Sequence, residues 1–149
     1  ESQLFKRLLK KMQPTEFKHI IALLALGRPG PLEAGIDQEY IDCLHGKQEP
    51  EYPHEDLEGV LEETFGFLLY QESIMKTSQK IAGFSLGQAD ILRRGMGKKK
   101  PEVLKRMRKE FVEGTLENGY SKELAEELFE LIEYFSGYGF NKAHKYIVA

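Results

Sequence analysis

The feature that most constrains the fold of this chain is the recurrence of apolar residues at spacings of three and four. The pattern covers most of the 149 residues, glycine and proline interrupt it, and alternating strand-like patterns are scarce. This period places apolar side chains on one face of an α-helix. The sequence therefore predicts a mainly α fold: a single multi-helix domain over residues 1–149, with about seven helices and little or no β structure.

Start and stop signals divide the pattern into segments. Asp37 is a candidate N-cap, Ser85 and Gln88 form a capping-box pair, Pro101 suits a first helical turn, and Ser121 is a further cap. Residues 65–70 are compatible with a short extended piece, although a helix from Tyr70 is preferred. We expect helices over about 3–12, 16–26, 37–45, 55–64, 70–82, 85–97, 101–118 and 121–135.

Two of these helices carry predictions about the core. Residues 17–26 are apolar on nearly every side, which predicts that they form the buried centre of the domain. In the helix over 85–97, Ala89, Leu92 and Met96 recur at helical spacing and are expected to face inward.

Composition favours a globular protein outside the membrane. Hydrophobic residues make up 41% and charged residues 30% of the chain, and no apolar run reaches the roughly 18 residues that a membrane span needs. The single cysteine, Cys43, agrees with a reducing compartment, so we expect a cytoplasmic location. Since the chain begins with Glu1 rather than Met, we also expect it to belong to a longer protein.

The net charge of −3 conceals a strong segregation of charge. Residues 87–110 hold nine Lys/Arg and three Asp/Glu, whereas residues 33–63 hold eleven Asp/Glu and one lysine. A one-sided basic segment indicates binding to a polyanion such as nucleic acid or a nucleotide phosphate. A merely solvated basic face remains the alternative at this point.

Within the basic segment, Asp90 precedes Arg94 by one helical turn, in the favourable acid-first order, so the two are expected to pair and Arg93 is expected to be the freer arginine. Arginine can clamp a phosphate with two donors, while lysine acts as a point charge. The candidate anion-binding residues are Arg28, Arg93, Arg94, Lys98, Lys99, Lys100, Asn141, Lys142 and His144.

No catalytic or metal-binding signature is present. The four aspartates form no Asp-x-Asp pair, and neither glycine-rich stretch has the spacing of a nucleotide-binding fingerprint. Cys43 and His45 diverge on a helix, which makes them a poor zinc pair even with His54 nearby. We therefore predict no catalytic residue, metal ligand or cofactor in this chain.

Seven motifs occur in order along the chain: RPGP at 28–31, YPH at 52–54, YQE at 70–72, AGFSLGQADILRRGMGKKKPE at 82–102, FVEG at 111–114, ENGYS at 117–121 and GYGFNKAH at 137–144. Together they closely resemble the fingers region of the bacterial DNA polymerase III alpha subunit, over nearly the whole chain. Two departures stand out. Gly95 replaces a common alanine, which should loosen its helix, and Ala143 replaces a common serine.

The resemblance implies a helical fingers domain that positions the incoming dNTP and the primer-template end. It implies that Arg93, Arg94 and the lysines after Gly97 face the triphosphate, that residues 137–149 include a second nucleotide-facing motif, and that Arg28 lies near the active site. Three metal-binding aspartates, with Mg²⁺, would belong to a palm domain outside this chain, so the chain alone should be inactive. The implied partners are the palm and thumb domains, the sliding clamp and other replisome subunits.

Another class of function stays open on the sequence alone. A stand-alone helical module that binds nucleic acid or another protein, with no catalytic context, would explain the basic segment equally well.

Overall fold

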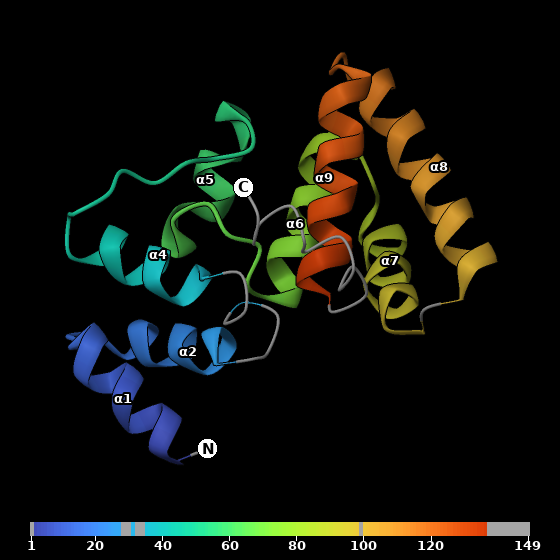
Figure 1. The fold of residues 1–149 in the computed structure, drawn as a ribbon. Helices are drawn as coiled ribbons and strands as arrows, with labels where there is room; N and C mark the ends of the chain where they lie inside the picture. The colour runs from blue at the N-terminus through green and yellow to red at the C-terminus, as the bar shows by residue number, and fades with distance from the viewer. Residues whose placement is uncertain (1, 28–30, 32–34, 99, 137–149) are drawn as a thin grey trace.

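The computed structural model describes residues 2–27, 31, 35–98 and 100–136, and within these ranges it is mainly helical, with loops between the helices and no strand (Figure 1). This confirms the predicted mainly α fold. The α-helices are α1 (Ser2–Met12), α2 (Phe17–Leu26), α4 (Ile36–Leu44), α5 (Glu58–Leu61), α6 (Gln71–Ala82), α7 (Leu86–Lys98), α8 (Pro101–Glu117) and α9 (Lys122–Phe135). Two 3-10 turns flank α5, namely η1 (Glu55–Leu57) and η2 (Glu62–Thr64).

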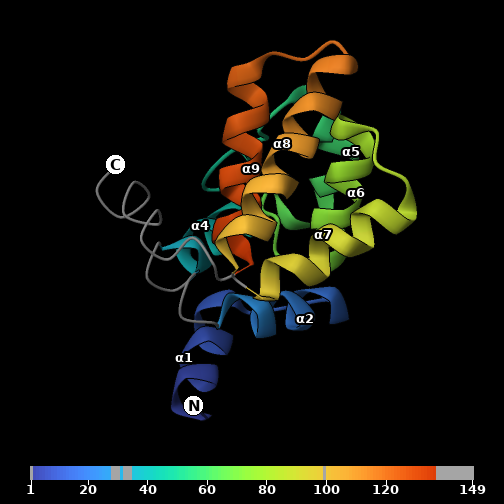
Figure 2. The same cartoon turned by 90° about the vertical axis from the view of Figure 1, so that its right-hand side faces the viewer.

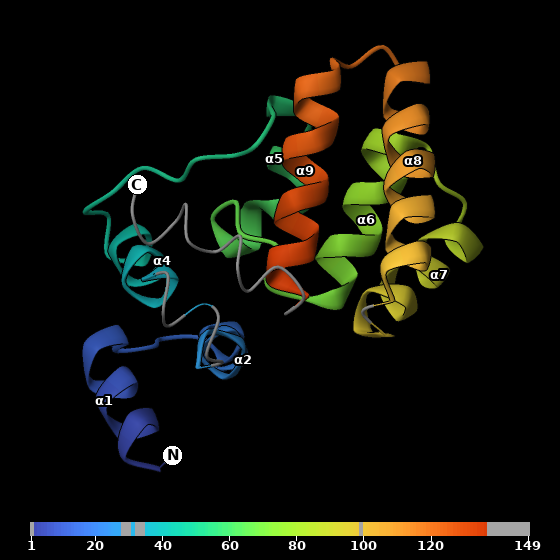
Figure 3. The same ribbon diagram turned by 45° about the vertical axis from the view of Figure 1, so that its right-hand side comes forward.

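The helices form two groups at opposite ends of the molecule. The N-terminal group consists of α1, α2 and α4, and the C-terminal group consists of α6 to α9 (Figures 1 and 3). Helices α8 and α9 run antiparallel, α6 packs against α7 and α8, and α7 lies where α8 begins (Figures 1 and 2). Buried apolar side chains from both groups join in one core cluster.

Edge-on and tilted aromatic contacts and close backbone contact hold the C-terminal group together. The ring of Phe111 on α8 lies 6.0 Å from that of Phe84 and 5.7 Å from that of Phe129 on α9, and Phe111 and Phe129 are fully buried. A Cβ atom added to Gly114 would lie 2.2 Å from the carbonyl oxygen of Ala82. The absence of a side chain at Gly114 thus allows α8 to approach the end of α6.

Several predicted helix signals are confirmed. The backbone N–H of Gln88 donates to Ser85 Oγ (3.1 Å) while the N–H of Ser85 donates to Gln88 Oε1 (2.9 Å), which is a complete capping box. The N–H of Leu124 donates to Ser121 Oγ at 3.1 Å. Pro101 occupies the first turn of α8. Local hydrogen bonds thus mark the starts of α7 and α9, and the fixed φ of proline marks the start of α8.

Two predicted boundaries are wrong. Gly35, not Asp37, caps α4, because its left-handed backbone (φ 76°) lets the chain enter the helix earlier and leaves Asp37 in the first turn. The single helix expected over 55–64 is instead η1, α5 and η2. Leu57 (φ −95°) and Leu61 (φ −111°) interrupt the helical dihedrals as both side chains turn into the core.

The prediction that residues 17–26 are the buried centre is also wrong. Ala22, Leu23 and Leu26 of α2 are buried, but Phe17 is 74% and Leu24 56% exposed. Two further apolar side chains of this helix, Ile20 and Ile21, are exposed as well. Helix α2 packs mainly against α1 and α4, and these contacts leave four of its apolar side chains exposed.

Candidate phosphate-binding site

The candidate site is built on the outward side of α7. Ala89, Leu92 and Met96 are buried, as the sequence predicted, and this orients the opposite side of the helix outward. Arg94 is exposed, and Asp90 and Arg93, which lie within one turn of it beside the buried stripe, are partly exposed. The packing of one apolar stripe therefore decides that these three charged groups share a face.

A single carboxylate contacts both arginines. Asp90 Oδ1 accepts hydrogen bonds from Arg93 Nε (3.2 Å) and Nη2 (2.6 Å). Asp90 Oδ2 lies 3.0 Å from Arg94 Nε. Arg93 Nη1 also donates to Gln71 Oε1, at 3.4 Å. The hydrogen bond from Arg93, followed by the charges of both arginines, lowers the pKa of Asp90 below its ordinary value, so the carboxylate is ionised at neutral pH.

The expectation that Arg93 is the freer arginine is wrong, whereas the predicted Asp90–Arg94 pair is confirmed. The side chain of Arg93 is 29% exposed and that of Arg94 is 61% exposed. On a helix, an acid three residues before an arginine is as close a neighbour as one four residues before. Both arginines reach Asp90 for this reason, and Arg94 offers more of its guanidinium to solvent.

Further positive charge follows on α8. Lys100, Lys105, Arg106 and Lys109 are exposed, and an open depression of about 590 Å³ on this helix is lined by Glu102, Lys105, Arg106, Arg108, Lys109 and Val112. The guanidinium of Arg108 is engaged by α9, because its carbon lies 5.6 Å from the Phe129 ring centre and its Nη1 lies 3.9 Å from Glu133 Oε1. The exposed lysines and Arg106 make α8 a second cationic surface after α7.

The remaining predicted site residues are placed in part or not at all. Lys98 lies in the last turn of α7, and Lys100 caps α8 with an extended backbone. Arg28, Lys99, Asn141, Lys142 and His144 lie outside the described residues, as does the side chain of Lys98. The proposed meeting of the basic segment with residues 141–144 stays a prediction.

Gly95 on α7 lies against α8. A Cβ atom at this position would lie 2.6 Å from Met107 Sδ and 2.9 Å from its Cε. Both are distal atoms of a flexible side chain, so an alanine would require Met107 to move. The absence of a side chain at Gly95 therefore leaves the space that the end of the Met107 side chain fills between α7 and α8.

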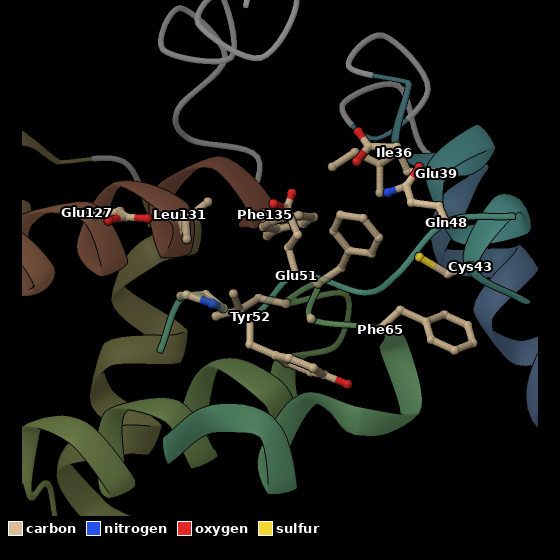
Figure 4. A pocket seen from close by; sticks show the side chains of 14 residues that line it. Ile36, Glu39, Cys43, Gln48, Glu51, Tyr52, Phe65, Glu127, Leu131 and Phe135 are labelled. Carbon is tan, nitrogen blue, oxygen red and sulfur yellow. The ribbon is translucent and has the colours of Figure 1, made fainter. Parts of the chain in front are cut away.

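A second hollow in the structure is acidic. It has a volume of about 390 Å³ and separates α4 from α9, with Glu39, Glu51 and Glu127 around it (Figure 4). Burial, followed by the charge of Glu39 and other nearby acids, raises the pKa of the Cys43 thiol beside it. Its full lining is Ile36, Glu39, Cys43, Gln48, Glu51, Tyr52, Pro53, Phe65, Gly66, Phe67, Leu68, Glu127, Leu131 and Phe135. The hollow has the wrong charge for a phosphate.

Two contacts between distant motifs were not foreseen from the sequence. Gln71, in the YQE motif, reaches Arg93 across 22 positions of the chain. Tyr120, in the ENGYS motif, donates its hydroxyl hydrogen to Asp56 Oδ2 (2.6 Å), and its ring lies 5.1 Å from that of His54 in the YPH motif. The sequence signals these contacts only in that both residues of each pair lie in or beside one of the seven motifs.

Within the described ranges no group of three or more His, Cys, Asp or Glu side chains is arranged to hold a metal ion. None of the helices in those ranges is long and apolar enough to cross a membrane.

Comparison with known proteins identifies the family. Residues 1–119 match the model of the bacterial DNA polymerase III alpha subunit finger domain. The chain is 50% identical over 149 residues to the DNA polymerase III subunit alpha of Pasteurella multocida and equally to that of Escherichia coli K12, covering 97% of this chain and 13% of each relative. The corresponding subunit of Aquifex aeolicus is 49% identical over 144 residues, covering 97% of this chain and 12% of that protein.

The chain thus spans about 13% of the length of such relatives. The order of motifs, the mainly helical fold and these similarities agree, and the chain belongs to the finger domain family of the bacterial DNA polymerase III alpha subunit.

Proposed function

We propose that this chain, as the fingers of a DNA-directed DNA polymerase, positions the triphosphate of the incoming dNTP and the primer-template end during DNA synthesis, and that it does not catalyse alone. The observation that carries the proposal is the pair Arg93 and Arg94, held by one carboxylate on the outer side of α7. Two guanidinium groups in fixed positions suit the charge that a transferring phosphoryl group develops.

The metal of such a reaction does not fit this site. The α7 surface offers guanidinium groups, and its one carboxylate already contacts both of them. Oxygen ligands in sufficient number, which Mg²⁺ requires, are absent from the described part of this surface. Mg²⁺ would then be bound by a palm domain of the parent protein, and the role proposed for this chain is binding and orientation.

The test is steady-state dNTP incorporation by a full-length alpha subunit that carries this fingers domain. Arg93→Ala and Arg94→Ala should each lower kcat/KM for dNTP by about tenfold or more, because each removes donors from the transferring phosphates. Lys47→Ala is the matched control, since Lys47 is an exposed cation in the acidic part of the chain. Unchanged kinetics in both arginine variants would remove the α7 surface from the site.

The cations of α8 suit the DNA backbone. Lys105, Arg106 and Lys109 lie together on the open depression of this helix, where the side chains are exposed. Replacing any one by Ala should weaken DNA binding and reduce the dependence of binding on salt by about one unit of slope, with little change in KM for dNTP. A salt series of primer-template binding measures this. An unchanged slope in all three variants would place DNA elsewhere.

A further inference from the structure

We propose that Asp90 and Gln71 are positioning residues, which set the orientation of Arg93 and Arg94 for the phosphate of the nucleotide. The inference rests on the proposed function of the two arginines and extends it to residues that would not touch the substrate. It assigns a role to the YQE motif, which the anion-binding prediction did not use.

The two carboxylate oxygens of Asp90 contact different arginines. Oδ1 accepts from two nitrogens of Arg93, and Oδ2 lies 3.0 Å from Arg94 Nε. With Gln71 Oε1 on Nη1, each of the three guanidinium nitrogens of Arg93 has an acceptor. Since a guanidinium is planar, acceptors on all three nitrogens fix both the position and the plane of the Arg93 group.

The same contacts predict different roles for the arginines. A guanidinium carries five N–H donors, and Arg93 uses three of them on Asp90 and Gln71, which leaves two. Arg94 contacts Asp90 through Nε, and it is the more exposed side chain. Its Nη1 and Nη2 edge is the better placed to clamp a phosphate with two parallel hydrogen bonds. Arg94 would then be the main clamp and Arg93 the fixed second contact.

Asp90 is an unexpected residue for an anion site on charge alone. Its negative charge offsets one of the two arginine charges, so an electrostatic role would predict tighter nucleotide binding once the carboxylate is gone. A positioning role predicts the opposite, because misplaced donors lose most of their effect on a reacting phosphate. The two roles therefore give opposite signs for the same substitution.

Gln71 adds a connection between helices. It is the first residue of α6, and α6 packs against α7, which carries Arg93. Asp90 alone would orient Arg93 relative to its own helix. The hydrogen bond from Arg93 to Gln71 ties it to the neighbouring helix as well, so the guanidinium keeps its place relative to the helical bundle.

The experiment compares dNTP incorporation by the full-length alpha subunit with Asp90→Asn, Asp90→Glu, Gln71→Leu, Arg93→Ala and Arg94→Ala. Asparagine keeps the size and removes the charge, and it should lower kcat at saturating dNTP by about tenfold. Glutamate restores a charged acceptor and should recover part of the loss. Gln71→Leu affects Arg93 alone and should cost about threefold. Thermal unfolding of each variant checks that the fold is kept.

The outcomes separate this inference from the proposed function. Wild-type kinetics in both arginine variants would contradict the proposed function itself. If the arginine variants are impaired while Asp90→Asn matches or exceeds the wild type, the site is real but Asp90 does not position it. Loss of kcat in Asp90→Asn with partial recovery in Asp90→Glu supports positioning. If Asp90→Asn unfolds, Gln71→Leu decides, and wild-type kcat in that folded variant overturns the inference.

Discussion

The two helix groups bury the apolar side chains of their helices to different extents. Helix α2 in the N-terminal group is more apolar along its length than α9 in the C-terminal group, yet α9 buries its apolar side chains and α2 leaves Phe17 and Leu24 exposed. The difference lies in the neighbours, since α9 packs closely against α8 whereas α2 makes sparser contacts with α1 and α4. Enclosure depends on how elements surround a helix and less on how apolar the helix is.

Different kinds of contact hold the helices of the two groups together. In the N-terminal group, His45 Nε2 donates to the Met12 carbonyl oxygen at 2.7 Å, and His19 Nδ1 accepts from the backbone N–H groups of Thr15 and Glu16 at 3.3 Å. The C-terminal group is instead held by edge-on and tilted aromatic contacts and by the close backbone approach at Gly114. Stability should therefore be concentrated in the C-terminal group.

The largest expected effect compares two phenylalanines. Phe111→Ala in the C-terminal group should lower the free energy of unfolding of the 149-residue chain by about 3–5 kcal/mol, because it leaves a cavity between the rings of Phe84 and Phe129. Phe17→Ala on exposed α2 should change it by about 0.5 kcal/mol or less. Urea unfolding followed by circular dichroism measures both. Equal losses would mean that α2 is as enclosed as α8.

A smaller effect is expected from two glycines. Gly114→Ala places a Cβ atom against the Ala82 carbonyl, where backbone must shift, and should cost about 1–3 kcal/mol. Gly59→Ala in α5 is the matched control. No atom of the described neighbours lies within 4 Å of its added Cβ, so it should be neutral or stabilising by up to about 1 kcal/mol. The same urea experiment applies, and a neutral Gly114→Ala would show that α6 and α8 can separate without loss.

The features that the sequence predicted correctly are local to one helix, whereas those it missed depend on neighbouring helices. Helix period, the capping box of Ser85 and the inward stripe of α7 are local, and local rules predicted them correctly. Burial of α2 is not local, because a period shows which side is apolar but not whether another helix covers it. The outward placement of the Arg93 and Arg94 surface followed from the stripe.

The site was predicted less completely than the helices. The pairing rule selected Asp90 for Arg94 correctly but overlooked that a long arginine side chain also reaches an acid three residues before it. The contact between Gln71 and Arg93 joins two helices, so no spacing rule within one helix could predict it. Local rules thus located the charged surface, while the orientation of its members required the three-dimensional packing.

The smallest expected effect concerns the hydrogen bond from Tyr120, at the loop between α8 and α9, to Asp56 in η1. Asp56 is 43% exposed, so solvent screening limits the contribution to about 1 kcal/mol or less, which Tyr120→Phe should remove. Free energies of unfolding of the wild type and of Tyr120→Phe at neutral pH measure the difference.

The pH dependence gives this contact its own signature. The hydrogen bond to Asp56, followed by burial and the Asp56 charge, raises the pKa of Tyr120 above its ordinary value. The stabilisation is therefore fully present below about pH 10, the pKa of an unfolded tyrosine, and is lost as the pH rises through the raised pKa. Tyr40 and Tyr70 also have raised pKa values, but they titrate in both proteins and cancel in the difference. A difference between wild type and Tyr120→Phe that stays constant from pH 8 to about pH 12 would contradict an ionisable donor in this bond, because a tyrosinate has no proton to give to Asp56.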